Sequence, residues 1–209
     1  MTDPSPPTLD DAAWEATPGD ALPERFERRL SWLLARVRAG ERVLDLGSGR
    51  GEFAAALGEH GCEVVAADPS PVAVARARFP TELLAPGPLP FEDSSFDVVW
   101  TGETIEHVAD TAAFLSEIRR VLRSGGRVLV STPWHGRLKT AALALLDHER
   151  ALDPSGPHLR FFTARGLTAL LDDLGFDRIA LSALGGVPLF RSTLLAEAVR
   201  PRSRVVVVP

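Results

Sequence analysis

The stretch Val43-Leu44-Asp45-Leu46-Gly47-Ser48-Gly49-Arg50-Gly51 decides the fold. A short apolar run carries one acidic residue and then breaks into three glycines at alternate positions, and residues 52–57 follow as a helix. This order predicts a strand, a tight turn and a helix N-terminus, with which α/β folds bind nucleotide-like ligands. Glycine is needed because a Cβ would block the sharp turn and keep the ligand away from the backbone amides.

The spacing of these glycines separates two kinds of nucleotide-binding turn. A dinucleotide fold has Gly-x-Gly-x-x-Gly, but its third glycine would fall at Glu52, a poor neighbour for a pyrophosphate at a positive helix end. A second predicted strand, residues 63–67, leads into Asp68. A carboxylate about 20 residues past the first glycine can bind both ribose hydroxyls. The alternative for Asp68 is to cap the helix that follows Pro69.

The pattern Asp-x-Gly-x-Gly-x-Gly resembles motif I of class I S-adenosylmethionine (SAM) methyltransferases. The resemblance implies that the turn packs against the methionine part of SAM and that an acidic residue near the strand end helps to hold its ammonium group. Together with the neighbouring strand ends, it implies a set of cofactor-binding residues. These are Asp45, Gly47, Ser48, Gly49, Gly51, Asp68, Pro69, Gly87, Leu89 and Thr101.

The resemblance covers about residues 40–180. Over this range the chain is similar to the group of methyltransferases that includes the ubiquinone-pathway enzymes. The matching segments are residues 89–99, 103–108, 114–133 and 158–176. One departure concerns adenine. Members often carry Asp-Ala before Leu-Pro-Phe, whereas this chain has Ala85-Pro86, with no side-chain acceptor and no N–H on the proline. Adenine is therefore expected to be held by packing from Leu89 or by backbone atoms of Gly87.

Bulk composition sets limits on the kind of protein. With 209 residues and 45% hydrophobic content, the chain can bury one core, so a single domain is expected. The net charge of −5 makes a nucleic-acid partner a poor expectation. Cys62 is the only cysteine, so neither an internal disulfide nor a zinc cluster is expected. Without a long apolar run or signal peptide, we expect a cytoplasmic monomer or homodimer acting on a small molecule.

The alternation of strands and helices predicts an α/β fold, a doubly wound, mostly parallel seven-stranded sheet of the Rossmann-like SAM methyltransferase type. Strands are expected at 43–46, 63–67, 82–85, 96–101, 127–132 and 176–182, and residues 192–199 are either a seventh strand or a helix. Helices are expected at 26–37, 52–58, 71–78, 111–123, 138–149 and 164–174. The domain should span 25–199, with a disordered or lid-like segment 1–24, a helical, substrate-side insertion 134–160 after strand five, and a tail 200–209.

Three polar residues follow the fourth predicted strand. If Glu103–His107 form a helical turn, then Glu103, Glu106 and His107 lie on one side of it. Two carboxylates and an imidazole can hold a divalent metal ion with open positions for substrate oxygens. Ubiquinone-pathway O-methyltransferases and small-RNA 2′-O-methyltransferases resemble this arrangement, and both add a later histidine, for which His158 is the nearest match. The alternative is that Glu and His serve turn geometry or act as a base without metal.

Methyl transfer from a sulfonium is an in-line displacement, so the protein mainly aligns the reactants. An oxygen nucleophile must also lose a proton, and the candidate catalytic residues are His107, Glu103 and His135. Trp134 and Phe161 are candidates to line a substrate pocket, whereas Trp100 is equally expected in the core.

The leading hypothesis is a SAM-dependent methyltransferase that acts on a hydroxyl of a phenol, quinol or sugar-like natural product. The alternatives are an N-methyltransferase, a small-RNA 2′-O-methyltransferase, an NAD(P)-dependent oxidoreductase, and a SAM-fold protein that binds partners without catalysis.

Overall fold

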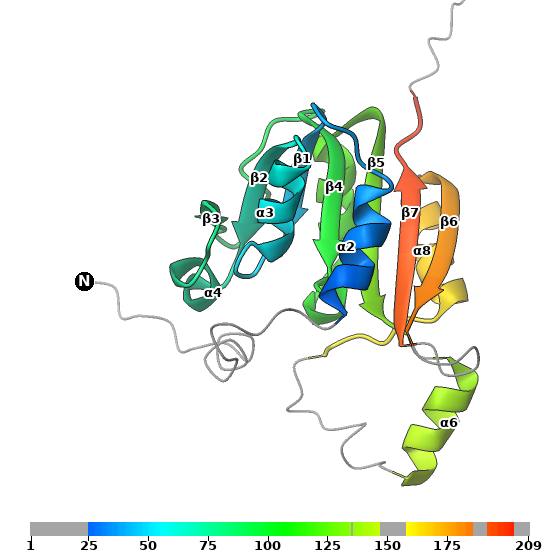
Figure 1. The fold of residues 1–209 in the computed structure, drawn as a ribbon. Helices are drawn as coiled ribbons and strands as arrows, with labels where there is room; N and C mark the ends of the chain where they lie inside the picture. Colours follow the sequence, from blue (N-terminus) through cyan, green and yellow to red (C-terminus); the bar gives the residue numbers. More distant parts are fainter. Residues whose placement is uncertain (1–24, 135, 147–157, 186–191, 203–209) are drawn as a thin grey trace, which may run out of the picture.

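A seven-stranded sheet forms the centre of the computed structural model, which describes residues 25–134, 136–146, 158–185 and 192–202 (Figure 1). The strands are β1 (Arg42–Leu46), β2 (Glu63–Asp68), β3 (Thr81–Leu83), β4 (Phe96–Gly102), β5 (Leu122–Pro133), β6 (Asp177–Leu184) and β7 (Thr193–Val199). Their order is β3-β2-β1-β4-β5-β7-β6. The predicted fold class is confirmed, and residues 192–199, left open between strand and helix, contain a strand.

Of the seven described strands, only β7 runs against the others. Strands β1 to β5 pair in parallel, and β7 lies antiparallel between β5 and β6. The carboxyl ends of β1, β2, β4 and β5 therefore meet at one edge of the sheet, where ligands bind in open α/β folds. The strand order reverses direction between β1 and β4, and the glycine turn follows β1 at this point.

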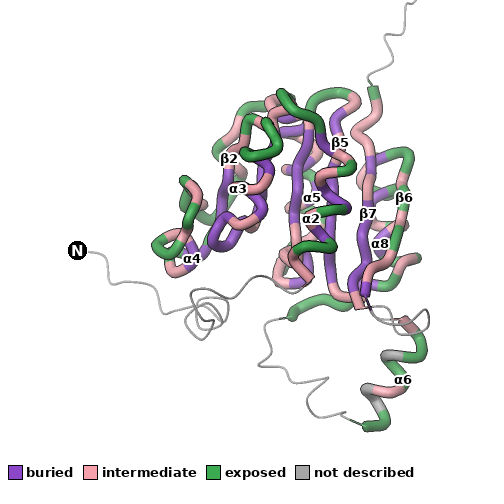
Figure 2. The backbone as a smooth tube through the Cα atoms, in the orientation of Figure 1, coloured by how far each residue is buried: buried purple, intermediate pink, exposed green. Residues whose placement is uncertain are grey.

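Helices cover both faces of the sheet (Figure 1). They are α2 (Phe26–Leu34), α3 (Glu52–Glu59), α4 (Pro71–Ala75), α5 (Thr111–Val121), α6 (Arg137–Leu146) and α8 (Ala164–Asp173), with a 3-10 turn η1 (Ile105–His107). Helices α2 and α3 pack with Val98 and Trp100 on one face, and α5 and α8 pack with Leu44 and Val128 on the other. Figure 2 shows β5 and β7 in the middle layer as largely buried, whereas the edge strand β6 is exposed or half-buried.

Side-chain caps fix where three of the helices begin. Ser70 Oγ accepts from the backbone N–H of Ala73 at the start of α4, and Asp110 and Thr163 act in the same way for α5 and α8. Such a cap satisfies one of the backbone donors left over at a helix start. Ser70, rather than Asp68, is therefore the capping residue of α4.

The predicted helix 111–123 is too long at its C-terminus. Helix α5 ends at Val121, and Gly125 and Gly126 lie within β5 instead of stopping the helix. A Cβ on Gly126 would lie 2.9 Å from the backbone oxygen of Arg123 and 3.0 Å from that of Asp97, so this pair of strands needs a glycine there. The pairing of β4 with β5 shifts register at the same place.

The other expected bounds were close. The helices predicted at 26–37 and 71–78 end earlier, at Leu34 and Ala75, and the helix predicted at 138–149 is described over Arg137–Leu146. The lid-like segment 1–24 and most of the tail 200–209 lie outside the described residues, so the predicted domain limits stay predictions.

Candidate active site

The glycine turn is held against the end of β2 and touches the segment after β4. The N–H groups of Gly47 and Ser48 donate to the backbone oxygen of Ala67 at 2.8 and 3.2 Å. Gly47 has φ +76, and a Cβ there would lie 2.3 Å from Thr104 Oγ1. Both the dihedral and this close approach require glycine, as the sequence predicted.

Asp68 lies at the end of β2 and points into the turn. Its Oδ2 accepts from the N–H of Gly49 and its Oδ1 from the N–H of Ser70, both at 2.8 Å. The carboxylate is 5% exposed. Because each carboxylate oxygen can accept more than one hydrogen bond, the predicted ribose role and this bracing of the turn are compatible.

Asp45 is buried at the base of the turn. It is 1% exposed, and its Oδ2 has no hydrogen-bond partner among the described residues. Burial, followed by the nearby charge of Asp68, raises the pKa of Asp45 to about 8. A nearby cation favours the ionised form of a buried carboxyl group, so Asp45 is suited to a ligand that carries positive charge.

Arg29 of α2 also reaches this edge, and the sequence reasoning missed it. Its side chain is 2% exposed, its Nη1 donates to Ser131 Oγ at 3.3 Å, and it lies 3.7 Å from Glu103 Oε1. The guanidinium stands 5.1 Å from the centroid of the Phe53 ring. The only signal in the sequence is its place three residues after Phe26, beside the apolar stripe of the helix.

Glu103 is turned away from the residues with which it was grouped. The segment that was predicted as a helical turn from Glu103 to His107 is a 3-10 turn over Ile105–His107 only, and Glu103 has a left-handed φ of 56°. Its N–H donates to the backbone oxygen of Ser131, and its Oε1 accepts from Ser131 Oγ at 3.0 Å. Glu103 thus faces Arg29 and β5.

Three of the four predicted metal ligands come together. Glu106, His107 and His158 each offer a ligand atom, and these atoms lie within 4.8 Å of one another. The imidazole rings of His107 and His158 are 4.9 Å apart between centroids. Glu103 does not belong to this group, in contrast to the predicted quartet.

Glu106 anchors this cluster from inside. It is 1% exposed, its Oε2 accepts from Thr132 Oγ1 at 3.0 Å, and its Oε1 has no hydrogen-bond partner in the described part of the chain. Burial and then Glu103 raise the pKa of Glu106 to about 7. Its backbone oxygen accepts from Leu159 and Arg160, which holds the segment with His158 against η1.

The segment with Leu89 is fixed by an ion pair on α5. Glu117 Oε2 accepts from the N–H of Leu89 at 2.8 Å. Arg120, which pairs with Glu117 at 2.8 Å, donates to the backbone oxygens of Phe91 and Leu89 at 2.7 and 3.0 Å. Residues 85–88, which include Gly87, are exposed, so the expected adenine contacts of Leu89 and Gly87 stay predictions.

The remaining predicted residues separate into core, surface and undescribed positions. Trp100 is fully buried and belongs to the core. The centroid of its ring lies 5.2 Å from that of Phe53 and 6.3 Å from that of Trp32. Thr101 is also fully buried, whereas Pro69 is exposed and Phe161 is 53% exposed. His135 lies outside the described residues.

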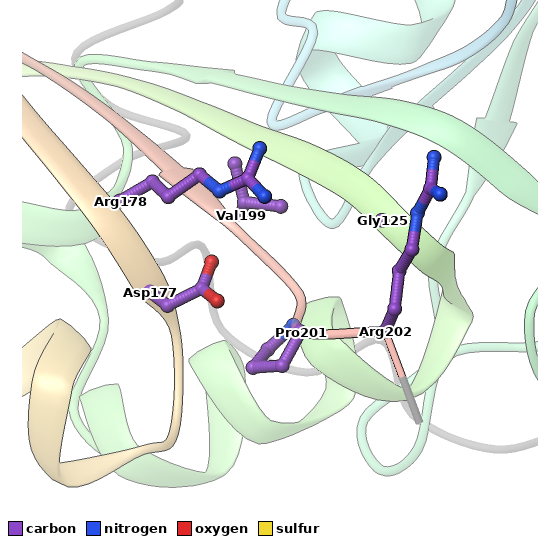
Figure 3. A pocket seen from close by; sticks show the side chains of 6 residues that line it. All are labelled: Gly125, Asp177, Arg178, Val199, Pro201 and Arg202. Atoms are coloured by element: carbon purple, nitrogen blue, oxygen red, sulfur yellow. The ribbon is translucent and has the colours of Figure 1, made fainter. Parts of the chain in front are cut away.

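A separate hollow lies at the opposite edge of the sheet, where β5 begins and β7 ends (Figure 3). Its volume is about 660 Å³, and it is lined by Gly125, Asp177, Arg178, Val199, Pro201 and Arg202. None of the predicted site residues lines it, so it is not the candidate active site.

The strand order, with its reversal beside a glycine turn, defines a cofactor-binding α/β protein of the doubly wound class. A family model described as a methyltransferase domain matches residues 20–181. A demethylmenaquinone methyltransferase of Beutenbergia cavernae is 33% identical over 196 residues, covering 83% of this chain and 82% of the relative. The chain belongs to the class I SAM-dependent methyltransferases.

Other relatives are methyltransferases by name as well. A ubiquinone biosynthesis O-methyltransferase of Bradyrhizobium is 32% identical, covering 80% of this chain and 69% of the relative. A probable SAM-dependent methyltransferase of Mycolicibacterium smegmatis is 38% identical over 69% of this chain, which spans 55% of that protein's length.

Solved structures support the fold. A Haloferax volcanii methyltransferase in complex with the Trm112 activator gives a TM-score of 0.72 at 22% identity, covering 92% and 97% of the two chains. A Haemonchus contortus phosphoethanolamine N-methyltransferase gives a TM-score of 0.71 at 19% identity, covering 93% of this chain and 57% of that protein's chain. Within the described residues, no helix is both long and apolar enough to cross a membrane.

Proposed function

We propose that this methyltransferase moves the methyl group of SAM to a hydroxyl of a small molecule bound at the carboxyl edge of the sheet. The observation that carries the proposal is a pair of buried groups of opposite chemical type, the carboxyl group of Asp45 below the glycine turn and the guanidinium of Arg29 against Ser131 and Glu103. The glycine turn lies close to both groups. Gly47 packs against Thr104, and the preceding residue, Glu103, faces Arg29. A methionine moiety carries both an ammonium and a carboxylate, and this arrangement complements both.

Each charged group of the cofactor then has a partner of opposite sign. The carboxylate of the methionine moiety pairs with the Arg29 guanidinium, which suits bidentate contact. The ammonium pairs with Asp45, and the ribose hydroxyls pair with Asp68. Fixing the cofactor at both ends aligns its methyl group for attack, which is the main contribution a protein makes to this displacement.

The reaction forms a bond between the acceptor oxygen and the methyl carbon while the bond from that carbon to sulfur breaks, leaving a neutral thioether. The acceptor hydroxyl gives up its proton during this step. His107 is the proposed base, because it lies beside Glu106 at this edge and imidazole titrates near neutrality. An amine acceptor would need less help with deprotonation. N-methylation is therefore the second candidate activity, and one of the structural neighbours is an N-methyltransferase.

A divalent metal ion is the alternative to a free His107 base, because the residues present fit one and a histidine that coordinates the ion cannot also take the proton of the acceptor. Glu106 offers an oxygen without a hydrogen-bond partner in the described chain, and His107 and His158 offer imidazoles within reach of it. Two histidines and one carboxylate form a common donor set for Fe²⁺, Mn²⁺ or Zn²⁺. When bound, the ion would supply Lewis-acid polarisation of the acceptor oxygen.

Calorimetry with S-adenosylhomocysteine tests the cofactor site. We expect Arg29→Met to weaken binding by about tenfold or more, since a charge-assisted hydrogen bond contributes about 1.5–3 kcal/mol. The matched control is Arg28→Met, an exposed neighbour on α2 that should bind as the unmodified protein does. If the unmodified chain gives no heat with S-adenosylhomocysteine but is saturated by NAD, the proposal is wrong.

Titration with Mn²⁺ tests the metal site independently of activity. Glu106→Gln and His158→Ala should each abolish binding of the ion, while the exposed His60→Ala should not change it. Binding that survives both substitutions rejects the site. Methyl transfer to phenols that withstands EDTA would instead favour His107 acting without metal.

A further inference from the structure

An apolar face of α6 is exposed. Leu138, Leu145 and Leu146 are 47%, 84% and 86% exposed. Their spacing places all three on one side of the helix, because residues seven and eight positions apart share a face two helical turns along the axis. Single exposed leucines are ordinary, but a contiguous apolar face marks an interaction surface.

A second pair of exposed apolar side chains lies where the chain returns to the sheet. Leu159 and Phe161 are each 53% exposed and flank the segment that starts with His158. The N–H of Leu159 donates to the backbone oxygen of Glu106, so the apolar surface is tied directly to the cluster at the carboxyl edge. Figure 1 shows α6 beyond the carboxyl ends of the parallel strands.

The surrounding charge indicates what covers this surface. Among the described residues 136–146 and 158–166, Arg137, Arg160 and Arg165 are exposed and no acidic residue occurs, although the whole chain has a net charge of −5. A second copy of the chain would bring these like charges together, whereas the headgroups of anionic lipids complement them. Leucines beside basic residues are typical of helices that lie in a lipid interface.

We propose that α6 and residues 158–161 dock on an anionic lipid bilayer, and that the methyl acceptor is an amphiphile that enters the site from that surface. The statement about the acceptor rests on the proposed function, whereas the docking does not. Docked in this way, the leucines of α6 lie among the acyl chains, and the carboxyl edge of the sheet faces the headgroups.

Flotation with vesicles tests the docking. The full chain is mixed with vesicles of equimolar phosphatidylcholine and phosphatidylglycerol, or of phosphatidylcholine alone. We expect binding to the anionic vesicles that weakens with added salt, and a loss of about tenfold or more in the double variant Leu145→Glu, Leu146→Glu. The matched control is Leu83→Glu, which adds one charge at an exposed leucine of β3 and should bind normally.

Three results would overturn the docking. The first is equal binding of the double variant and the unmodified chain, and the second is no preference for anionic vesicles. The third is a homodimer in sedimentation that the double variant disrupts, because the leucines would then cover each other. Calorimetry with S-adenosylhomocysteine on the same samples keeps the outcomes apart: retained cofactor binding without flotation rejects only the docking, and lost cofactor binding in the unmodified chain rejects the proposed function.

Discussion

Binding of the cofactor should release a proton from Asp45. The carboxyl group is 1% exposed, and burial together with the charge of Asp68 raises its pKa to about 8, so most molecules carry it protonated at pH 7 before the cofactor binds. An ammonium placed against this group favours the ionised form. The proton must therefore leave as the ammonium arrives, and affinity for the cofactor becomes dependent on pH.

The size of the effect follows from linkage. Below the raised pKa, each pH unit increases the ionised fraction about tenfold, so the affinity for S-adenosylhomocysteine should rise about tenfold from pH 6 to pH 7. At pH 7 about 0.9 proton should be released for each ligand bound. The rise should flatten near pH 8, where Asp45 is half ionised and where the α-amino group of the ligand begins to lose its own proton.

Calorimetry in buffers of different ionisation enthalpy measures this release directly. Asp45→Asn is the control: it should bind more weakly, with no proton release and a flat affinity between pH 6 and pH 7. The free protein offers a second readout. Because the native state holds a proton that the unfolded chain has lost, its free energy of unfolding should fall as pH rises from about 4 to about 8. Affinity that does not change with pH in the unmodified protein would refute the assignment of Asp45.

Three further substitutions test the surroundings of the site. Gly47→Ala should lower cofactor affinity by about tenfold in calorimetry. The backbone φ of +76 and the approach of the new Cβ to 2.3 Å from Thr104 Oγ1 cause about 1–2 kcal/mol of strain in the turn. Arg120→Ala should lower Tm by about 5 °C in thermal unfolding, because about 2 kcal/mol of charged hydrogen bonding to the Leu89 segment is lost, and Arg120→Lys should not restore it. Arg200→Ala removes a cation from carbonyls at the end of α5 and should cost about 1 kcal/mol in denaturant unfolding, so an unchanged midpoint would contradict that role.

The fold was predictable because its signals are local. The glycine turn, the apolar strands and the caps on Asp110 and Thr163 each depend on residues close in the chain. Errors arose where tertiary contacts decide. Gly125 and Gly126 predict the end of a helix, yet they lie in β5, because the oxygens of Arg123 and Asp97 leave no room for a Cβ at Gly126.

The site was less predictable because its contacts join distant segments. Nothing in the sequence places Arg29 within reach of Ser131, 102 residues later, since a lone arginine beside an apolar stripe is usually a solvated charge. The grouping of Glu103 with Glu106 assumed regular helical spacing, which the left-handed backbone of Glu103 breaks. His158 was identified through resemblance, and only the folded chain brings it to His107.

The two carboxylates after β4 therefore serve different partners. Glu103 faces the buried guanidinium of Arg29, which the proposed function assigns to the cofactor. Glu106 faces the two histidines, which the proposed function assigns to the acceptor. Because Glu103 also raises the pKa of Glu106, a cofactor carboxylate that pairs with Arg29 and leaves Glu103 less neutralised should make Glu106 harder to ionise. On the proposed function, binding of the cofactor should therefore be coupled, through charge alone, to the ionisation of Glu106.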